Sequence, residues 1–280
     1  MRYIKKHEYL NSIAPLNLKF DYIHIQTEAF KNSNVQSLLF KGNTTIEENA
    51  FENCKNLTDI EFATPFLKLN NSFVGCNNIE NLTISGDSIL DVKLNSIVFD
   101  CCKIKNLTIK NAKISPYVFM NSKIENITLI DCKLEENCFY NINNVNSIWI
   151  ENCCLRNGNS FKINNSNRLS IKLINCQTDF NKTLFHDTTI MDLVLDTDLV
   201  PERYKEEFTD KEIARKLSMQ FTSCKIGHLF YNQNFFKEEY FNDSKFLNVE
   251  PINLDILLEL KKNYKDMNNY YKKLEELKEL

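Results

Sequence analysis

Residues 45–62 read TIEENAFENCKNLTDIEF and contain one complete unit of a repeat. Phe51 stands near its centre, and Leu57, Ile60 and Phe62 follow with the spacing apolar-x-x-apolar-x-apolar. The last part of this pattern has a period of two, so Ile60 and Phe62 point to the same side of an extended chain. We therefore predict a short strand in the second half of the unit and a return segment in the first half.

Phenylalanine recurs at the corresponding place in one unit after another. Successive members of the series lie 20 to 26 residues apart, except for a gap of 36 residues between Phe185 and Phe221. The series comprises Phe30, Phe51, Phe73, Phe99, Phe119, Phe139, Phe161, Phe185, Phe221 and Phe241. In most units the strand pattern begins five or six residues later, as Ile124 does after Phe119. The seventh unit has Arg168 in place of the first apolar residue, and we expect an irregular turn there.

A single unit of this kind cannot enclose an apolar core. Stacked units can, because each covers the apolar face of its neighbour and pairs its strand in a parallel ladder. The sequence therefore predicts an α/β solenoid, a stack of about ten repeats of 20 to 26 residues with a parallel β-sheet on its concave face.

The unit around Phe51 resembles the BspA-like class of leucine-rich repeats, which read Ile-x-x-x-Ala-Phe-x-x-Cys-x-x-Leu-x-x-Ile. Ile46, Ala50, Phe51, Cys54 and Leu57 match this pattern position by position. The resemblance covers residues 20–250 and becomes looser after the third unit. It implies a repeat protein that binds other proteins, and because many members are secreted adhesins or surface proteins, it also implies an extracellular adhesin as the alternative.

One internal segment interrupts the repeat at about residues 197–218. Pro201 is suited to the first turn of a helix, and Thr209-Asp-Lys-Glu212 is a capping box, so two short helices are predicted. We interpret them as a lengthened return segment, with a projecting partner-binding element as the alternative.

The two ends of the chain also depart from the repeat. Residues 1–19 are predicted to be an N-terminal cap or a degenerate first repeat, which leaves residues 20–250 as the solenoid. Apolar residues after Pro251 follow helical spacing and predict an amphipathic helix over residues 251–280. This helix either caps the stack or joins two copies, so the protein is expected to be a monomer or a dimer through the helix.

Charge and composition exclude several classes of partner. The net charge of -3 provides no positive field for phosphates, so direct contact with nucleic acid is not expected. The first residues contain no secretory apolar region, and no stretch is long and apolar enough to span a membrane. We therefore expect a cytoplasmic protein with no membrane partner.

The residues that could perform chemistry are scattered. The four histidines lie in separate regions, and the chain contains five glycines and no phosphate-binding loop. Most of the ten cysteines stand at repeat positions, none forms a Cys-x-x-Cys pair, and they are predicted to fill the core. No enzyme activity, metal or cofactor is expected.

Outward residues on consecutive strands should form rows across the sheet. The central row is predicted to be Leu39, Glu61, Thr83, Thr108, Thr128, Trp149, Lys172, Val194 and Phe230. Its two aromatic residues near charged ones have the composition of a binding hot spot. The predicted partner-binding residues are Thr128, Trp149, Glu151, Lys172, Val194, His228 and Phe230. The sequence leaves open whether Trp149 and Phe230 are exposed or lie under the helical elements.

These features predict a non-enzymatic protein that binds another protein through its concave sheet, as an adaptor or a stoichiometric inhibitor. A bacterial or phage inhibitor of a host defence or toxin protein is one form of this function, and a BspA-like surface adhesin is the alternative. A carbohydrate-active parallel β-helix ranks last, because Glu61 is the single acidic residue of the central row.

Overall fold

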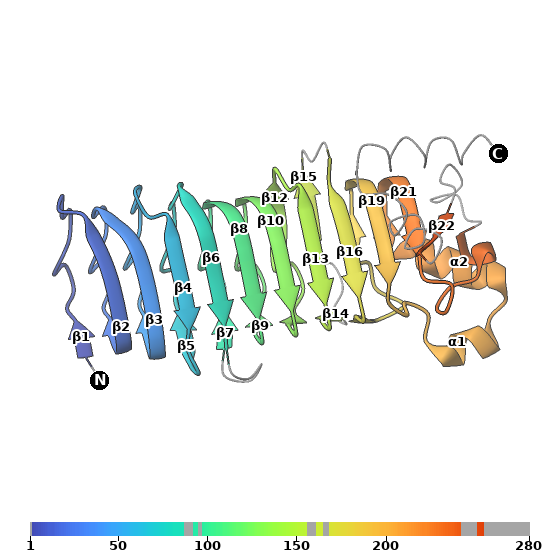
Figure 1. The fold of residues 1–280 in the computed structure, drawn as a ribbon, viewed down its shortest axis with the longest axis horizontal. Coiled ribbons are helices and arrows are strands. Elements are labelled where there is room, and N and C mark those ends of the chain that lie inside the picture. Colours follow the sequence, from blue (N-terminus) through green and yellow to red (C-terminus); the bar gives the residue numbers. More distant parts are fainter. Residues whose placement is uncertain are drawn as a thin grey trace, which may run out of the picture.

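The protein is a column of stacked turns, seen in a computed structural model that describes residues 2–86, 92–94, 97–155, 161–164, 168–241 and 251–254. All strand pairs are parallel, and Figure 1 shows the turns following one another along a single axis. The predicted fold, a stack of leucine-rich repeats, is confirmed.

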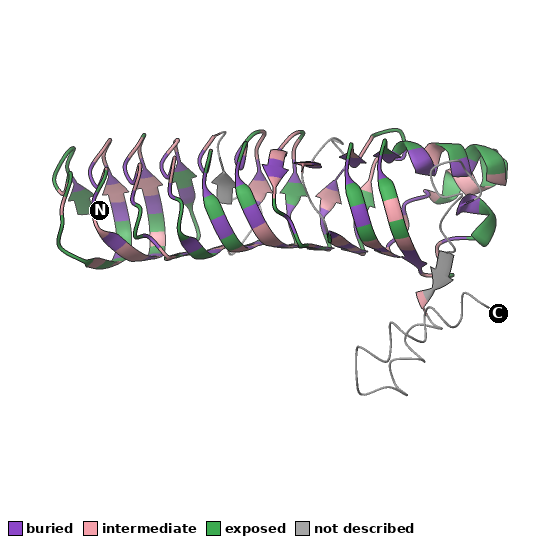
Figure 2. Cartoon of the chain, turned by 90° about the horizontal axis from the view of Figure 1, so that it is seen from above, coloured by how far each residue is buried: buried purple, intermediate pink, exposed green. Residues whose placement is uncertain are grey.

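Each turn has three sides, and the first carries the longest continuous sheet, which we call the long sheet. Its strands pair in chain order: β2 (Leu16–Ile25), β3 (Val35–Ile46), β4 (Asp59–Ala63), β6 (Ile79–Ser85), β8 (Lys103–Lys110), β10 (Lys123–Ile130), β13 (Ser147–Glu151), β16 (Ser170–Ile174), β19 (Thr189–Asp196), β21 (Lys225–Tyr231) and β22 (Pro251–Asn253). Buried and more exposed residues alternate along strands such as β4 and β13, and Figure 2 shows buried residues in purple and exposed ones in green. The period of two in the sequence thus places one set of side chains in the core.

Shorter strands form the other two sides. The second side contains β1 (Arg2–Ile4), β5 (Leu67–Leu69), β7 (Val92–Leu94), β9 (Lys113–Ile114), β11 (Lys133–Leu134), β14 (Cys154–Leu155) and β17 (Gln177–Thr178), together with the second halves of β2 and β3. The third side carries the phenylalanine series and includes β12 (Phe139–Asn143), β15 (Phe161–Asn164), β18 (Phe185–His186) and β20 (Phe221–Thr222).

The column is nearly straight in Figures 1 and 2, so the predicted concave face is a flat one. A solenoid curves when one side of each repeat is thicker than the other. Here the first two sides are strands, and the turns of the third side also hydrogen-bond to the next repeat, as the Phe30 N–H does to the Ala50 carbonyl oxygen at 2.8 Å. All three sides therefore advance by the same strand spacing of about 4.8 Å per turn. The surface available for binding is therefore the flat outer face of the long sheet.

Left-handed backbone at the corners lets the chain change direction between sides. One corner lies two residues after the phenylalanine and is formed by Asn32, Asn53, Gly75, Cys101, Asn121, Asn141, Asp187 and Ser223. Another lies at the end of the long strand and is formed by Tyr22, Gly42, Asn111, Asp131, Asn152 and Asn175. Asparagine tolerates this conformation better than most residues with a Cβ atom. A chain with five glycines can therefore make many sharp corners.

A column of stacked rings fills the core. It runs from Tyr9 through the phenylalanine series to Phe221, with neighbouring ring centroids 4.8 to 5.9 Å apart and planes within 15° of parallel. The widest step, 5.9 Å, joins Phe185 to Phe221 across the helical insertion. Each offset-stacked pair adds roughly 0.5–1.5 kcal/mol beyond the burial of apolar area.

Most cysteines also occupy core positions. The thiol of Cys54 donates to the Phe30 carbonyl oxygen at 3.2 Å, and that of Cys102 donates to the Phe73 carbonyl oxygen at 3.0 Å. Burial raises the pKa of Cys54 to about 11 and that of Cys102 to about 12. The prediction was wrong for Cys101, which forms a left-handed corner and is exposed, while Cys102 takes the core position.

Two helices lie between β19 and β20, where Pro201 and Thr209 predict them. They are α1 (Glu202–Glu207) and α2 (Asp210–Met219), and α2 buries Ile213 and Leu217. The 3-10 helix η1 (Glu238–Phe241) follows β21. Residues Pro251–Asn253 pair with β21 as a strand, so the predicted C-terminal helix does not begin at residue 251. Its remainder lies outside the described residues, and the division into cap, solenoid and terminal helix stays a prediction.

Candidate functional site

The strand register places the predicted central row in one line across the long sheet. Consecutive pairs run from Leu39 opposite Glu61 to Val194 opposite Phe230, with Trp149 between Thr128 and Lys172. The spacing of the sequence therefore locates these positions correctly.

The two aromatic residues of the row have different environments. Trp149 is 44% exposed, whereas Phe230 is 6% exposed. Phe230 lies opposite Ile252, because β22 adds a further strand beside β21. In this structure Phe230 is thus a buried residue, and we remove it from the candidate surface.

Two charged neighbours hold the indole of Trp149. The Lys172 ammonium lies over the ring, 4.9 Å from its centroid, and the indole N–H donates to Glu151 Oε2 at 3.2 Å. A cation–π contact at an exposed site contributes about 0.5–1 kcal/mol. All three residues stand on paired strands, so the ring is positioned before any partner arrives.

Apolar residues surround this group on the outer face of the long sheet. Ile130, Glu151 and Ile174 are consecutive members of the next outward row, and both isoleucines are half-buried. We define the Trp149 surface as Thr128, Ile130, Trp149, Glu151, Lys172, Ile174 and Val194. The sequence analysis missed Ile130 and Ile174. They stand two residues after the central row, where the alternation of a strand makes them point outward.

His228 stands one row away, at the end of the sheet near the helices. Its Nδ1 lies 2.9 Å from Asp192 Oδ1, and the Ser170 hydroxyl donates to Asp192 Oδ2 at 3.1 Å. Asp192 and His228 stand two residues before Val194 and Phe230 on their strands, so the pair belongs to the row next to the central one. His228 is therefore a neighbour of the Trp149 surface that is already engaged with Asp192.

An open pocket adjoins the Trp149 surface. It has a volume of about 540 Å³ and is lined by residues that include Ile174, Asp196, Asp198 and Phe235. Ile174 belongs to both features, and Asp196 is the next member of its row. The pocket therefore lies at the corner where β16 and β19 end, and it meets the Trp149 surface at Ile174.

The histidines do not assemble a catalytic group. Each lies beside a carboxylate in a different part of the chain, as His7 does with Glu28 and His24 with Glu47, both at 2.7 Å. In the described ranges, no group of three or more metal-ligating side chains occurs. No helix of the described part is long and apolar enough to cross a membrane.

Comparison with known proteins decides the family. A family model described as BspA type leucine rich repeat region matches residues 3–125 and 92–201, with 6 copies. The chain belongs to the BspA-type leucine-rich-repeat family. The resemblance noted from the unit around Phe51 is confirmed. No curated protein and no solved structure was found to match this chain.

The matched part of this BspA-type protein includes Trp149 and Lys172 and stops at residue 201, where α1 is about to begin. The stack nevertheless continues beyond the helices, because β19 pairs with β21 in register. Leucine-rich-repeat proteins are typically non-enzymatic and present a surface built from many repeats.

Proposed function

We propose that this BspA-type protein binds another protein through the Trp149 surface and acts as an adaptor or a stoichiometric inhibitor. The observation that carries the proposal is the 44% exposure of Trp149 on a regular sheet. Large aromatic residues are enriched among the residues that dominate binding energy, above all where polar groups surround them. Ile130, Ile174 and Val194 supply the apolar surroundings, and Glu151 and Lys172 supply polar groups.

The rigidity of the site supports the proposal. Binding costs about 0.5–1.5 kcal/mol for each flexible side chain that must be ordered at an interface. Lys172 and Glu151 already restrain the Trp149 ring, so less of this cost remains. A flat sheet also offers several strands at once to a partner.

The test is quantitative capture of partners by the whole protein and by matched variants. We expect Trp149→Ala and Lys172→Glu to lose the specific partner, while Glu61→Lys, in the same row several strands away, retains it. Removal of a hot-spot residue weakens binding by about 2 kcal/mol or more, which is roughly thirtyfold. Unchanged capture by Trp149→Ala would mean that the Trp149 surface is not the binding site.

We also propose that the protein acts in the cytoplasm. Most of the ten cysteines are buried in the core at repeat positions, and this use of cysteine as a small apolar residue suits a reducing compartment. An inhibitor of a host defence or toxin protein, encoded by a bacterium or a phage, is one form of the proposal, and the neighbouring genes test it.

The second candidate function is a surface adhesin, which the family match favours. Fractionation of the producing cell separates the two candidates, because an adhesin must be found at the surface. Light scattering of the purified chain tests whether it is a monomer or a dimer through its C-terminal segment.

A further inference from the structure

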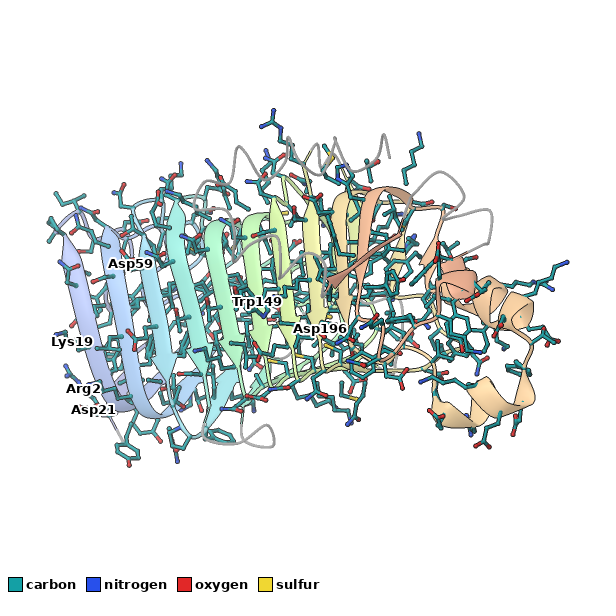
Figure 3. The ribbon with its side chains drawn as sticks, turned by 45° about the vertical axis from the view of Figure 1, so that its right-hand side comes forward. Arg2, Lys19, Asp21, Asp59, Trp149 and Asp196 are labelled. Atoms are coloured by element: carbon teal, nitrogen blue, oxygen red, sulfur yellow. The ribbon has the colours of Figure 1, made fainter. Side chains whose placement is uncertain are left out.

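Asp196 lies close to Trp149 on the outer face of the long sheet (Figure 3). It follows Glu151 and Ile174 in their row and stands two strands away from β13. Strands about 4.8 Å apart and a rise of about 3.3 Å per residue place the Asp196 and Trp149 backbones about 12 Å apart.

The pocket of about 540 Å³ provides room for a side chain beside this carboxylate. Asp196 and Asp198 are among its lining residues, together with the apolar residues Ile174 and Phe235. A long side chain with an apolar stem and a charged head could place its stem along Phe235 and its head at Asp196.

Asp196 differs from the two neighbouring aspartates in its partners. Asp198 pairs with Lys205 at 3.1 Å, and Asp192 lies 2.9 Å from His228. The Asp196 carboxylate accepts a hydrogen bond from the Asn232 side chain at 2.9 Å, and no ion pair among the described residues includes it. An acidic ligand would be repelled here, whereas a cationic side chain would be attracted.

We propose that the partner inserts an arginine or lysine side chain into this pocket, against Asp196, while an apolar side chain of the same segment packs on Trp149. An extended segment covers about 12 Å in three to four residues, so the two side chains should be separated by that interval. Arginine fits best, because its planar fork can contact a carboxylate through two hydrogen bonds. This inference rests on the proposed function and adds to it that the binding segment of the partner carries a positively charged side chain.

The test uses the whole protein and a displayed library of random dodecapeptides. We expect the selected peptides to combine an apolar residue with an arginine or lysine three to four residues away. Asp196→Asn should weaken binding of a selected peptide by about tenfold, because a charge-assisted contact becomes a neutral one. Asn232 can still donate to the new amide oxygen, so the fold should be unaffected, and a thermal melt checks this.

Asp21→Asn is the matched control, because Asp21 begins the row that ends in Asp196 and lies at the opposite end of the column. The Asp21→Asn variant should bind the selected peptide with the same affinity as the wild type. Asp196→Lys should reject the basic peptides. Selection of peptides with no basic preference, or equal binding to Asp196→Asn, overturns the inference.

The two proposals fail in different ways. If Trp149→Ala loses the selected peptide and Asp196→Asn does not, the assignment of Asp196 is wrong and the Trp149 surface stands. If the library yields no peptide whose binding depends on Trp149, both proposals are contradicted.

Discussion

Single residues at the corners explain how this chain forms a three-sided coil with few glycines. Asn121 has a φ of +57°, and the corresponding corner of the next turn is Asn141, with a φ of +60°. The Asn141 side-chain amide donates to Asn121 Oδ1 at 2.7 Å, so the corner residues also join neighbouring turns. These asparagines therefore serve both the backbone geometry and the stacking.

Asn121→Val tests the conformational requirement, with Asn121→Gly as its control. Both variants lose the side-chain hydrogen bonds, but only valine is strained at positive φ. We expect Asn121→Val to be less stable than Asn121→Gly by about 1–2 kcal/mol, measured by urea unfolding. Equal stability of the two variants would show that the corner does not require left-handed backbone.

The stacked rings make a second prediction at the level of single residues. Phe119 is buried between Phe99 and Phe139, with centroid distances of 5.3 and 5.1 Å. Phe119→Ala should lower the free energy of unfolding by about 3–5 kcal/mol, because it leaves a cavity in the column. Thr108→Ala, on the outer face, should cost less than about 1 kcal/mol in the same urea titration. A similar loss for both variants would contradict this description of the core.

Among the elements, α2 has a well-defined start. The Thr209 side chain accepts from the Glu212 N–H, and Glu212 Oε2 accepts from the Thr209 N–H at 2.9 Å and from its hydroxyl at 2.8 Å. The pKa of the Glu212 carboxyl is lowered from its ordinary value of 4.5. The main cause is the hydrogen bond from the Thr209 backbone N–H, and the second is the hydrogen bond from the Thr209 hydroxyl. The stabilisation of α2 by this carboxylate is therefore present at neutral pH and is lost as the pH falls through the lowered pKa.

Hydrogen exchange of α2, corrected for the intrinsic rates, measures this effect. Protection of residues 210–219 should decrease as the pH falls below 4.5, while protection of β8 changes less. Glu212→Gln should flatten the pH dependence of α2, because an amide does not titrate there. If the protection of α2 in Glu212→Gln depended on pH as it does in the wild type, the effect would belong to another titrating group.

The strands of the long sheet were predictable in detail, because their apolar residues repeat with a fixed phase. The seventh unit departs from this phase by one residue, since the buried residue is Leu169 and not Arg168, while β16 pairs in register with β13 and β19. Residues 165–167 of this unit lie outside the described residues, so the expected irregular turn stays a prediction. Strand spacing alone does not reveal a shift of one residue in a turn of unusual length.

At the scale of the whole molecule, the sequence did not predict the straightness of the column or the full composition of the Trp149 surface, and both became clear from the structure. Straightness depends on all three sides advancing by the same spacing per turn, and the second and third sides are too short to show a period. Phe230 is buried, and its register neighbour belongs to β22, a strand at a place where the sequence showed helical spacing. The pocket at Asp196 combines a strand, a corner and Phe235, which are far apart in the chain.

Fluorine NMR of the protein labelled with 5-fluorotryptophan tests the central claim most directly. The chain contains one tryptophan, so the label gives a single resonance from Trp149. Titration with the unlabelled partner should shift this resonance and reduce its sensitivity to a soluble paramagnetic agent, because the partner covers a side chain that is 44% exposed. A partner that binds at full stoichiometry and leaves both properties unchanged would contradict the claim that the protein acts through the Trp149 surface.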